Sequence, residues 1–470
     1  MLLGRIRRSL PRIVLGTIVS AGALDTACTV SGGPNGVEPI VYPTPPVGTI
    51  GDSQGQTLKT FTGPADPGAG GFVVTVSGEV NAISGYPFPP FDPSQTWMVD
   101  GWNWRIEKYI VVLDHIALWS NPNVSPTDQS QHGPQVAHAD GPFVVDLHKG
   151  GSLAGAGGGG EQALAITTIT NQNDNGGAPF DPTTTYGFGF STVPAPANYG
   201  AINVNLDATE AADYAYMAAG GYSVYYYGTA TWAGDQNGSA AGFTGMCTQT
   251  STGVASTGAD AGTAEGGGAD DAGIGGYDFT RLPPTMTFQL GFSTPTNYVN
   301  CVNYTLSEQE SATIRGVQTS PSQSVVAQIT IHMDHPFWES FAENSPVHWD
   351  QIAAQYIGVA NPVAHTEDLK GVPFNPFTDK LGDVMPWRNC APTLYTPPTN
   401  GAMSFSTLSV PQNPHGVCTG QPGVDSSKDD CPAIRDYYDF IRYTQSTQGH
   451  LNSQGLCFID RQYPAPAGGS

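Results

Sequence analysis

The stretch from Trp102 to Trp119 constrains the fold of this chain more than any other. Asp100-Gly101 before it is a turn signal, and residues 110–118 carry apolar side chains on both faces, as in a strand that is buried on two sides. Asp114 and His115 interrupt this apolar run. We expect that pair either to be fixed in a hydrogen-bond network or to line the same site as His332, because an unsatisfied polar group in a core costs roughly 1–3 kcal/mol.

Glycine and proline limit what the rest of the chain can build. The 470 residues could form two or three domains by length, but 59 glycines and 39 prolines dilute the core-forming sequence. We therefore predict a mainly β protein, with one β-sandwich or jelly-roll-like body, a few peripheral helices and long Gly-rich loops.

Alternating apolar residues predict further strands, and capping signals predict three helices. The strands are expected at residues 71–80, 143–147, 222–232, 285–292 and 325–333. One helix is expected over 207–220, where Asp207 and Glu210 form a capping box. A second is expected to begin at Ser345-Pro346 and to stop at Gly358, and a third to begin at Pro432.

The composition along the chain predicts four parts. Residues 1–28 resemble an export signal with a lipobox-like end, and residues 29–60 are expected to form a flexible tether. Residues 61–385 are expected to form the β-sandwich body, with a disordered Gly/Ala/Thr-rich insert at about 237–275. Residues 386–470 are expected to be a loop-rich, disulfide-stapled segment packed on that body.

The N-terminal residues and the cysteines indicate an exported protein. Four arginines precede an apolar run over residues 13–23, which is too short for a permanent membrane anchor. Cys28 follows, as in the lipobox of bacterial lipoproteins, so we expect lipid attachment there and an outer-membrane, periplasmic or cell-surface location. The remaining cysteines are even in number and are available for disulfides in an oxidising compartment: Cys247, Cys301, Cys390, Cys418, Cys431 and Cys457.

The charge restricts the partners. The formal net charge is −23, although only 12% of the residues are charged. So acidic a surface argues against nucleic acid or an anionic membrane as a partner, and it suits a body that meets cations. Contact with a membrane is expected only through the lipid anchor.

Histidines and acids concentrate in residues 330–350. At the end of the strand predicted over residues 325–333, His332 and Asp334 alternate with core residues, and His335 follows directly. His348 lies in the first turn of the helix expected from Ser345, where the helix dipole disfavours a charged imidazole. Neutral imidazole with carboxylate suits zinc or copper, so we predict a transition-metal site from His332, Asp334 and His335, with His348 as a further ligand.

Two other places could supply ligands. Asp114-His115 interrupts the long strand, and Asp146 and His148 share one face of the strand expected over residues 143–147, so His115 and His148 join the candidate ligands. Residues 171–176 partly match a calcium loop, but Pro182 stands where that loop requires a glutamate, so calcium is less favoured than copper or zinc.

Three functions remain open at this point. The first is an exported, lipid-anchored protein that binds copper or zinc without catalysis. The second is a cell-surface structural or interaction lipoprotein whose histidines form ordinary hydrogen bonds. The third is a metal-dependent hydrolase with Glu339 as general base. No nucleophile elbow, Walker loop or kinase signature is present, so a binding role is favoured over an enzyme.

Several segments carry a resemblance. The lipobox-like start, the acidic Gly/Pro-rich body and the segments D-G-W-N-W, D-L-H-K-G-G and H-M-D-H-P-F-W resemble uncharacterised secreted bacterial lipoproteins. The chain is also faintly similar to secreted copper-binding proteins of methane-oxidising bacteria. That second resemblance implies a copper site made of an oxidised Trp and two His, here Trp102 or Trp104 with His115 and His332.

Overall fold

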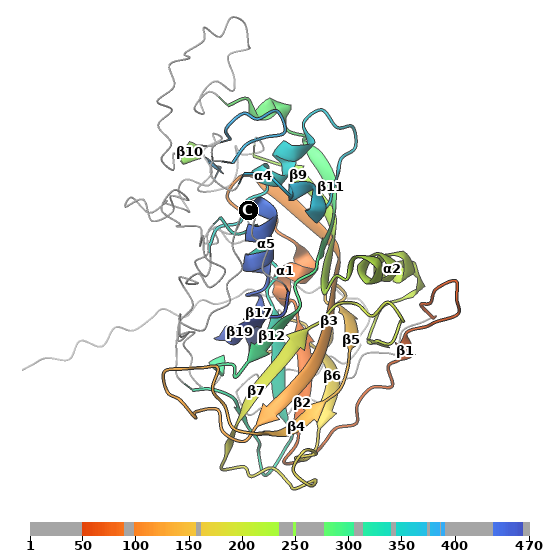
Figure 1. Cartoon of the computed structure of the whole chain (residues 1–470), viewed down its shortest axis with the longest axis vertical. Helices are drawn as coiled ribbons and strands as arrows, with labels where there is room; N and C mark the ends of the chain where they lie inside the picture. Colours follow the sequence, from red (N-terminus) through yellow and green to blue (C-terminus); the bar gives the residue numbers. More distant parts are fainter. Residues whose placement is uncertain are drawn as a thin grey trace, which may run out of the picture. The chain divides into compact units, whose positions relative to one another are not determined.

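The computed structural model describes residues 49–88, 98–156, 161–234, 248–250, 277–304, 314–339, 345–373, 377–385, 387–390 and 436–463. All these residues belong to the second of two units of the chain, Pro39–Ser470. This second unit is mainly β, as predicted (Figure 1). No helix among the described residues has the length and apolar character needed to span a bilayer.

The strand β3 (Trp102–Trp119) organises the larger, twelve-stranded sheet. On one edge its first part pairs with β9 (Val224–Trp232) and its last part with β7 (Thr185–Thr192). On the other edge it pairs with β5 (Phe143–Asp146) and β4 (Gln135–Ala139). The sheet also contains β1 (Lys59–Thr60), β8 (Ile202–Asn203), β11 (Thr285–Phe292), β12 (Thr296–Val299), β13 (Val317–Gln318), β15 (Val363–Ala364) and β19 (Phe458–Arg461).

A second sheet has five strands. Its order is β18 (Gly455–Leu456), β17 (Gly449–Leu451), β14 (Val325–Ile331), β2 (Phe72–Ser77) and β6 (Leu164–Ile169). β14 runs parallel to β2 and antiparallel to β17. A separate two-stranded ladder joins β10 (Thr248–Thr250) to β16 (Trp387–Asn389). The first of these strands lies in the predicted disordered insert, whose other residues up to 275 are outside the described part.

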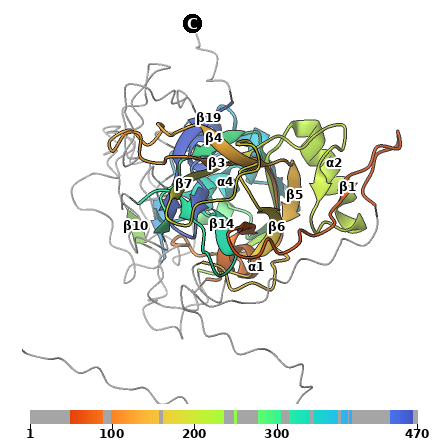
Figure 2. The ribbon, with the colours of Figure 1, turned by 90° about the horizontal axis from the view of Figure 1, so that it is seen from below.

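Both faces of β3 are buried, which confirms the prediction of a strand buried on two sides. Val111 and Leu113 join the main core, to which β2 and β14 of the second sheet also contribute. Ile110 and Val112 face the other way and pack with Met217 of α2 (Ala211–Gly220). In both views of the ribbon, α2 lies on the side of β5 that is away from β3 (Figure 1 and Figure 2). The long strand is therefore covered by a sheet on one face and by a helix on the other.

The first predicted helix is confirmed and the second is shorter than expected. Asp207 and Glu210 form the capping box of a short 3-10 turn that leads into α2. The second helix does not begin at Ser345: α4 spans Asp350–Ala353 and continues as a 3-10 turn to Tyr356. Val347 instead forms β-bridges with Met98 and with Trp338, so it is paired as in a strand and does not continue a helix from Ser345.

The C-terminal segment is part of both sheets. The helix predicted from Pro432 begins, among the described residues, at Tyr437 as α5 (Tyr437–Gln445), with the Asp436 side chain accepting from the Asp439 amide. β17 and β18 then extend the smaller sheet, and β19 pairs with β12 in the larger one. The sequence analysis did not predict these strands, because they are only two to four residues long.

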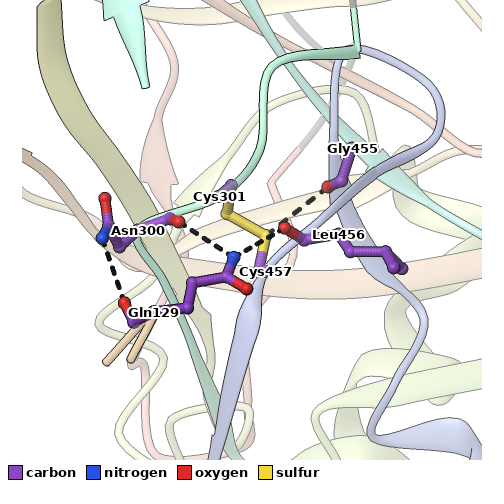
Figure 3. Close-up of a disulfide and its surroundings, with 6 residues drawn as sticks. All are labelled: Gln129, Asn300, Cys301, Gly455, Leu456 and Cys457. Carbon is purple, nitrogen blue, oxygen red and sulfur yellow. Dashed lines mark hydrogen bonds between the residues drawn. A yellow bond between two sulfur atoms is a disulfide. The ribbon is translucent and has the colours of Figure 1, made fainter. Parts of the chain in front are cut away.

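One disulfide ties this segment to the body. Cys301 and Cys457 are bonded, and they lie 156 residues apart in the sequence. The Gln129 amide donates to the carbonyls of Asn300 and Leu456 on the two sides of the bond (Figure 3). Cys390 is also disulfide-bonded. The other cysteines, Cys28, Cys247, Cys418 and Cys431, lie outside the described residues.

Candidate metal centre

The candidate site begins where β14 ends. As predicted, Ala327, Ile329, Ile331 and Met333 enter the main core. Gln328 and Thr330 on the opposite face are also buried, although they are polar. His332 directly follows the strand, and residues His335–Phe337 form a single 3-10 turn. This turn places His335 close to His332, with ring centroids 5.2 Å apart and the planes nearly perpendicular.

A third histidine comes from the C-terminal segment. His450 on β17 lies opposite Thr330 in the β14–β17 ladder, and the His332 amide continues that ladder by donating to the Gln448 carbonyl (2.9 Å). His332 and His450 are therefore diagonal neighbours on one face of the pair, which brings long side chains into contact. Their rings stack with centroids 4.1 Å apart and planes inclined by 16°.

The three imidazoles form a buried cluster, which we call the His cluster: His332, His335 and His450. One nitrogen of each lies within 4.8 Å of one nitrogen of each of the others. His335 and His450 are 0% exposed, and His332 is 6% exposed. Tetrahedral zinc with bonds of about 2.0–2.1 Å places ligand nitrogens about 3.3 Å apart, and this is the spacing that the three nitrogens need to hold one ion.

Hydrogen bonds determine the tautomer of His335. Its Nδ1 lies 2.7 Å from the Thr447 hydroxyl, and that hydroxyl donates its own proton to the Thr444 carbonyl (2.7 Å). The hydroxyl oxygen must therefore accept from Nδ1–H. The lone pair of His335 is then on Nε2, which is buried and makes no hydrogen bond.

The same reasoning applies to His332. Its Nε2 lies 3.0 Å from the Ser453 carbonyl, which can only accept a hydrogen bond. Nε2 therefore carries a proton, and in the neutral ring Nδ1 carries the lone pair. A metal-binding histidine commonly donates its other ring N–H to a carbonyl or carboxylate, and His332 has that arrangement.

Neither nitrogen of His450 makes a hydrogen bond. Burial, followed by charge on His332, lowers its pKa well below the usual range, and the nearby main chain of Thr447 and Gln454 opposes this only in part. Burial likewise lowers the pKa of His335, as do charges on His332 and His450. Both rings are therefore held neutral, which is the form that binds a metal.

The stacked pair limits how an ion could be bound. Lone pairs of imidazole lie in the ring plane, so a metal bound by a ring lies close to that plane. The nearly parallel rings of His332 and His450 cannot both meet this condition at one point between them. One of the two rings must turn when an ion binds, whereas His335 already stands perpendicular to both.

Of the ligands predicted from the sequence, the structure brings together His332 and His335. Asp334 accepts from the Trp338 indole (3.0 Å) and is not one of the clustered ligands. The Trp338 ring lies against the His335 ring, with centroids 3.8 Å apart. Asp334 therefore holds in place an aromatic ring that covers one side of the cluster.

His348 belongs to a different network. It precedes α4 instead of lying in the first turn of a helix, and its Nε2 is 2.6 Å from a carboxylate oxygen of Glu339. Burial lowers its pKa, but the hydrogen bond and charge of Glu339, with Asp100 and Asp350, outweigh this and raise the pKa overall. The expectation that a helix dipole keeps this ring neutral is therefore wrong. Glu339, the general base of the hydrolase hypothesis, is the partner of His348.

His115 and His148 also lie elsewhere. His115 occupies a bulge of β3 with φ of 49°, and its side chain is exposed. Asp114 beside it accepts from the amides of Gly141 and His115, so of the two expectations for this pair the hydrogen-bond network holds for the aspartate. His148 bonds through Nδ1 to the Ala82 carbonyl (2.8 Å).

The Trp-and-His set implied by the copper-protein resemblance is not assembled. Trp102 and His115 lie on the same strand, thirteen residues apart, which corresponds to about 40 Å at 3.3 Å per residue. Trp102 donates to Asp350 (2.8 Å), and Trp104 is packed among aromatic rings of the core. In the candidate calcium loop, Asn173 and Asp174 bond to His138, as expected of an Asn-rich turn.

His450 was missed from the sequence. It stands in a polar segment with only three strand residues, and its partner strand is more than a hundred residues earlier. The available signal was the turn at Asn452-Ser453, with Leu451 before it and Leu456 after it, which indicates a short hairpin. Nothing in that signal says which strand the hairpin joins.

The fold and the site together define a β-sandwich with a buried three-histidine cluster at the end of one strand. No family model, curated protein or solved structure matches this chain.

Proposed function

We propose that this protein is an exported, lipid-anchored protein that binds a transition-metal ion through His332, His335 and His450. The supporting observation is a convergence of buried imidazoles in which Nε2 of His335 and both nitrogens of His450 make no hydrogen bond. A buried polar group without a partner costs about 1–3 kcal/mol, and an ion that accepts these lone pairs would remove that cost.

The ligand chemistry favours copper or zinc. Neutral imidazoles suit both ions, and the general affinity order places copper(II) above zinc. Calcium and magnesium prefer oxygen ligands, and the cluster offers nitrogens. Because three protein ligands leave a fourth position for water or another group, the coordination number does not by itself distinguish storage from catalysis.

The proposed cellular location is inferred from the first residues of the chain. The arginines before the apolar run and Cys28 after it support export and lipid attachment. Metal released or captured outside the cytoplasm would reach such a protein directly. Labelling with a radioactive fatty acid, compared between the natural chain and Cys28→Ala, tests the anchor separately from the metal.

The metal proposal is tested on protein purified from the periplasm or membrane without an affinity tag. We expect about one equivalent of zinc or copper to bind the metal-stripped protein in a calorimetric titration. His450→Ala and His335→Ala should weaken binding by more than the 10–100-fold that loss of an outer partner typically costs. His138→Ala is the matched control, since that histidine is bonded to Asp174 outside the cluster.

Two results would contradict the proposal. One is a wild-type protein that takes up neither ion under these conditions. The other is equal affinity for the wild type and His450→Ala, because binding would then occur at another place. Circular dichroism of each variant identifies any loss of affinity that comes from unfolding.

A metal-free structural role is the second candidate, and the stacked rings favour it. The 16° inclination of His332 against His450 is the geometry of two rings packed face to face. In that case His450→Phe, which preserves a stacked ring, should retain the stability of the wild type. In the metal-binding case the same variant folds but no longer binds the ion.

A further inference from the structure

Glu79 approaches the His cluster from a different element. It is the first residue of α1 (Glu79–Ser84), separated from the end of β2 by Gly78, and β2 is the parallel neighbour of β14. Its backbone amide donates to the Ser77 hydroxyl (2.9 Å), which itself donates to the Glu161 carbonyl. The turn from β2 into α1 is therefore held in place on the side where His332 emerges.

The carboxylate of Glu79 contacts the protonated side of His332. Its Oε1 lies 3.5 Å from His332 Nε2, the nitrogen that donates to the Ser453 carbonyl. The Ser453 hydroxyl and the Gln454 amide are also 3.5 Å from the same oxygen. These three contacts are long, so the carboxylate has polar neighbours without a short hydrogen bond to any of them.

Glu79 is also the acid on the solvent side of the cluster. Its side chain is 21% exposed, whereas that of His332 is 7% exposed. Asp334, the other nearby acid of the described residues, is engaged by the Trp338 indole. Glu79 is therefore placed to add negative charge to the imidazole without closing the lone-pair side of the ring.

The backbone at this contact is strained on both sides. Glu79 has φ of 61° and Ser453 has φ of 74°, a left-handed conformation that glycine adopts at far lower cost. Residues 452–454 form the three-residue β17–β18 turn, a loop whose left-handed position glycine usually fills. Strained residues that carry side chains tend to cluster at functional sites, and these two meet at His332.

We propose that Glu79 is the outer carboxylate of the metal site, acting through His332. This inference rests on the metal-binding function proposed above. When an ion binds at Nδ1, the Nε2–H becomes a stronger donor, and Glu79 together with the Ser453 carbonyl accepts the increased positive charge. Glu79 is thus a positioning residue that orients His332 and strengthens its bond to the ion, in the way carboxylate partners act on other metal-bound histidines. It is not one of the three clustered ligands.

The test compares Zn²⁺ affinity and the visible spectrum of the Co²⁺-loaded protein for wild type, Glu79→Gln and Glu79→Asp. We expect Glu79→Gln to bind Zn²⁺ about 10–100-fold more weakly, with the Co²⁺ bands unchanged in position. Glu79→Asp should recover part of that loss, since it retains the charge. Glu107→Gln on β3 is the control, and it should bind as the wild type does.

A second variant separates function from folding. Glu79→Gly removes the left-handed strain, so the metal-free protein should melt at a higher temperature while binding Zn²⁺ more weakly. A variant that is more stable and binds less well cannot be explained by a general loss of structure.

The outcomes are distinguishable. Equal affinity of wild type and Glu79→Gln overturns this inference and leaves the metal-binding function standing. Loss of the Co²⁺ bands in Glu79→Gln also overturns it, because Glu79 would then be a direct ligand. Failure of the wild type itself to bind Zn²⁺ or Co²⁺ overturns the proposed function and this inference with it.

Discussion

At the scale of single residues, the buried carboxyl group of Asp100 links two distant parts of the chain. Its Oδ2 accepts the amides of Trp349 (2.5 Å) and Asp350 (2.8 Å), so it caps α4 from 250 residues away in the sequence. Burial, followed by the charge of Asp350, raises its pKa to about 7, although His348 and these two amides oppose the shift.

The raised pKa of Asp100 predicts a pH dependence of stability. In the unfolded chain this acid titrates near 3.8, so between about pH 4 and 7 the folded protein holds a proton that the unfolded chain has lost. The stability from this group is present below pH 4 and is lost as the pH rises through about 7. The slope is at most about 1.4 kcal/mol per pH unit for one proton.

Denaturant unfolding at pH 4.5 and 7 for wild type and Asp100→Asn measures this contribution. We expect the fall in unfolding free energy over that range to be smaller in Asp100→Asn, because the amide does not titrate. Asp66→Asn, at an exposed position, should leave the fall unchanged. Parallel curves for wild type and Asp100→Asn would show that Asp100 is ionised throughout.

The two buried histidine sites also differ in the charged groups that surround them. His348 has Glu339 beside it and Arg388 lies on the far side of Asp350, so charge is balanced there by ion pairs. In the His cluster, the Glu79 carboxylate contacts only His332. The rings of His335 and His450 have no acid in hydrogen-bond contact. The first arrangement supports a fold, and the second leaves lone pairs for a ligand.

At the scale of secondary-structure elements, α2 covers the face of β3 that the second sheet does not reach. Met217 of α2 is fully buried with Tyr214, against Ile110 and Val112 of β3. Asp213 also holds the helix to the sheet, through the Tyr225 hydroxyl (2.7 Å) and the Lys108 ammonium. Two different kinds of contact therefore attach one helix to the central strand.

Removing the Met217 side chain should destabilise the protein without affecting the site. We expect Met217→Ala to lower the unfolding free energy by about 2–5 kcal/mol, the usual cost of a cavity in a packed core. Metal affinity should be unchanged, since α2 and the His cluster lie on opposite faces of β3. A large loss of affinity in a folded Met217→Ala protein would show that the two faces are coupled.

The elements with long patterns were predicted well from the sequence. β3, β9, β11 and β14 begin at or within two residues of the expected positions, because continuous apolar or alternating runs specify them locally. The helix expected at Ser345 was wrong in its start, because Val347 pairs with Met98 and Trp338 and the distant Asp100 supplies the cap. Long-range hydrogen bonds, and not the local capping signals, determine where this helix begins.

At the scale of the whole described unit, the C-terminal segment joins the two sheets. β17 delivers His450 to β14, and β19 pairs with β12 only a few residues later. The Cys301–Cys457 disulfide lies between these two pairings and closes a loop of 156 residues. A disulfide that closes a long loop lowers the entropy of the unfolded chain, so this bond should stabilise the fold substantially.

Removal of the disulfide should therefore affect both stability and the site. We expect Cys301→Ala/Cys457→Ala to lower the unfolding free energy by about 2–5 kcal/mol under non-reducing conditions. Metal affinity should fall as well, because the β17–β18 hairpin that carries His450 loses its covalent tie. Stability equal to that of wild type would mean that the pairing of β17 and β19 holds the segment without the bond.

The sequence by itself determined the mainly β class, the doubly buried central strand, the capped helix before the Tyr run and two of the three clustered histidines, His332 and His335. Each of these follows from side-chain periodicity or neighbouring residues, which act within one element. Only the tertiary structure decided that His450 completes the cluster, that His348 leaves it for Glu339, and that Glu79 contacts His332. These choices depend on which strands pair across more than a hundred residues, and a pairing of that kind is set by the packing of the whole core.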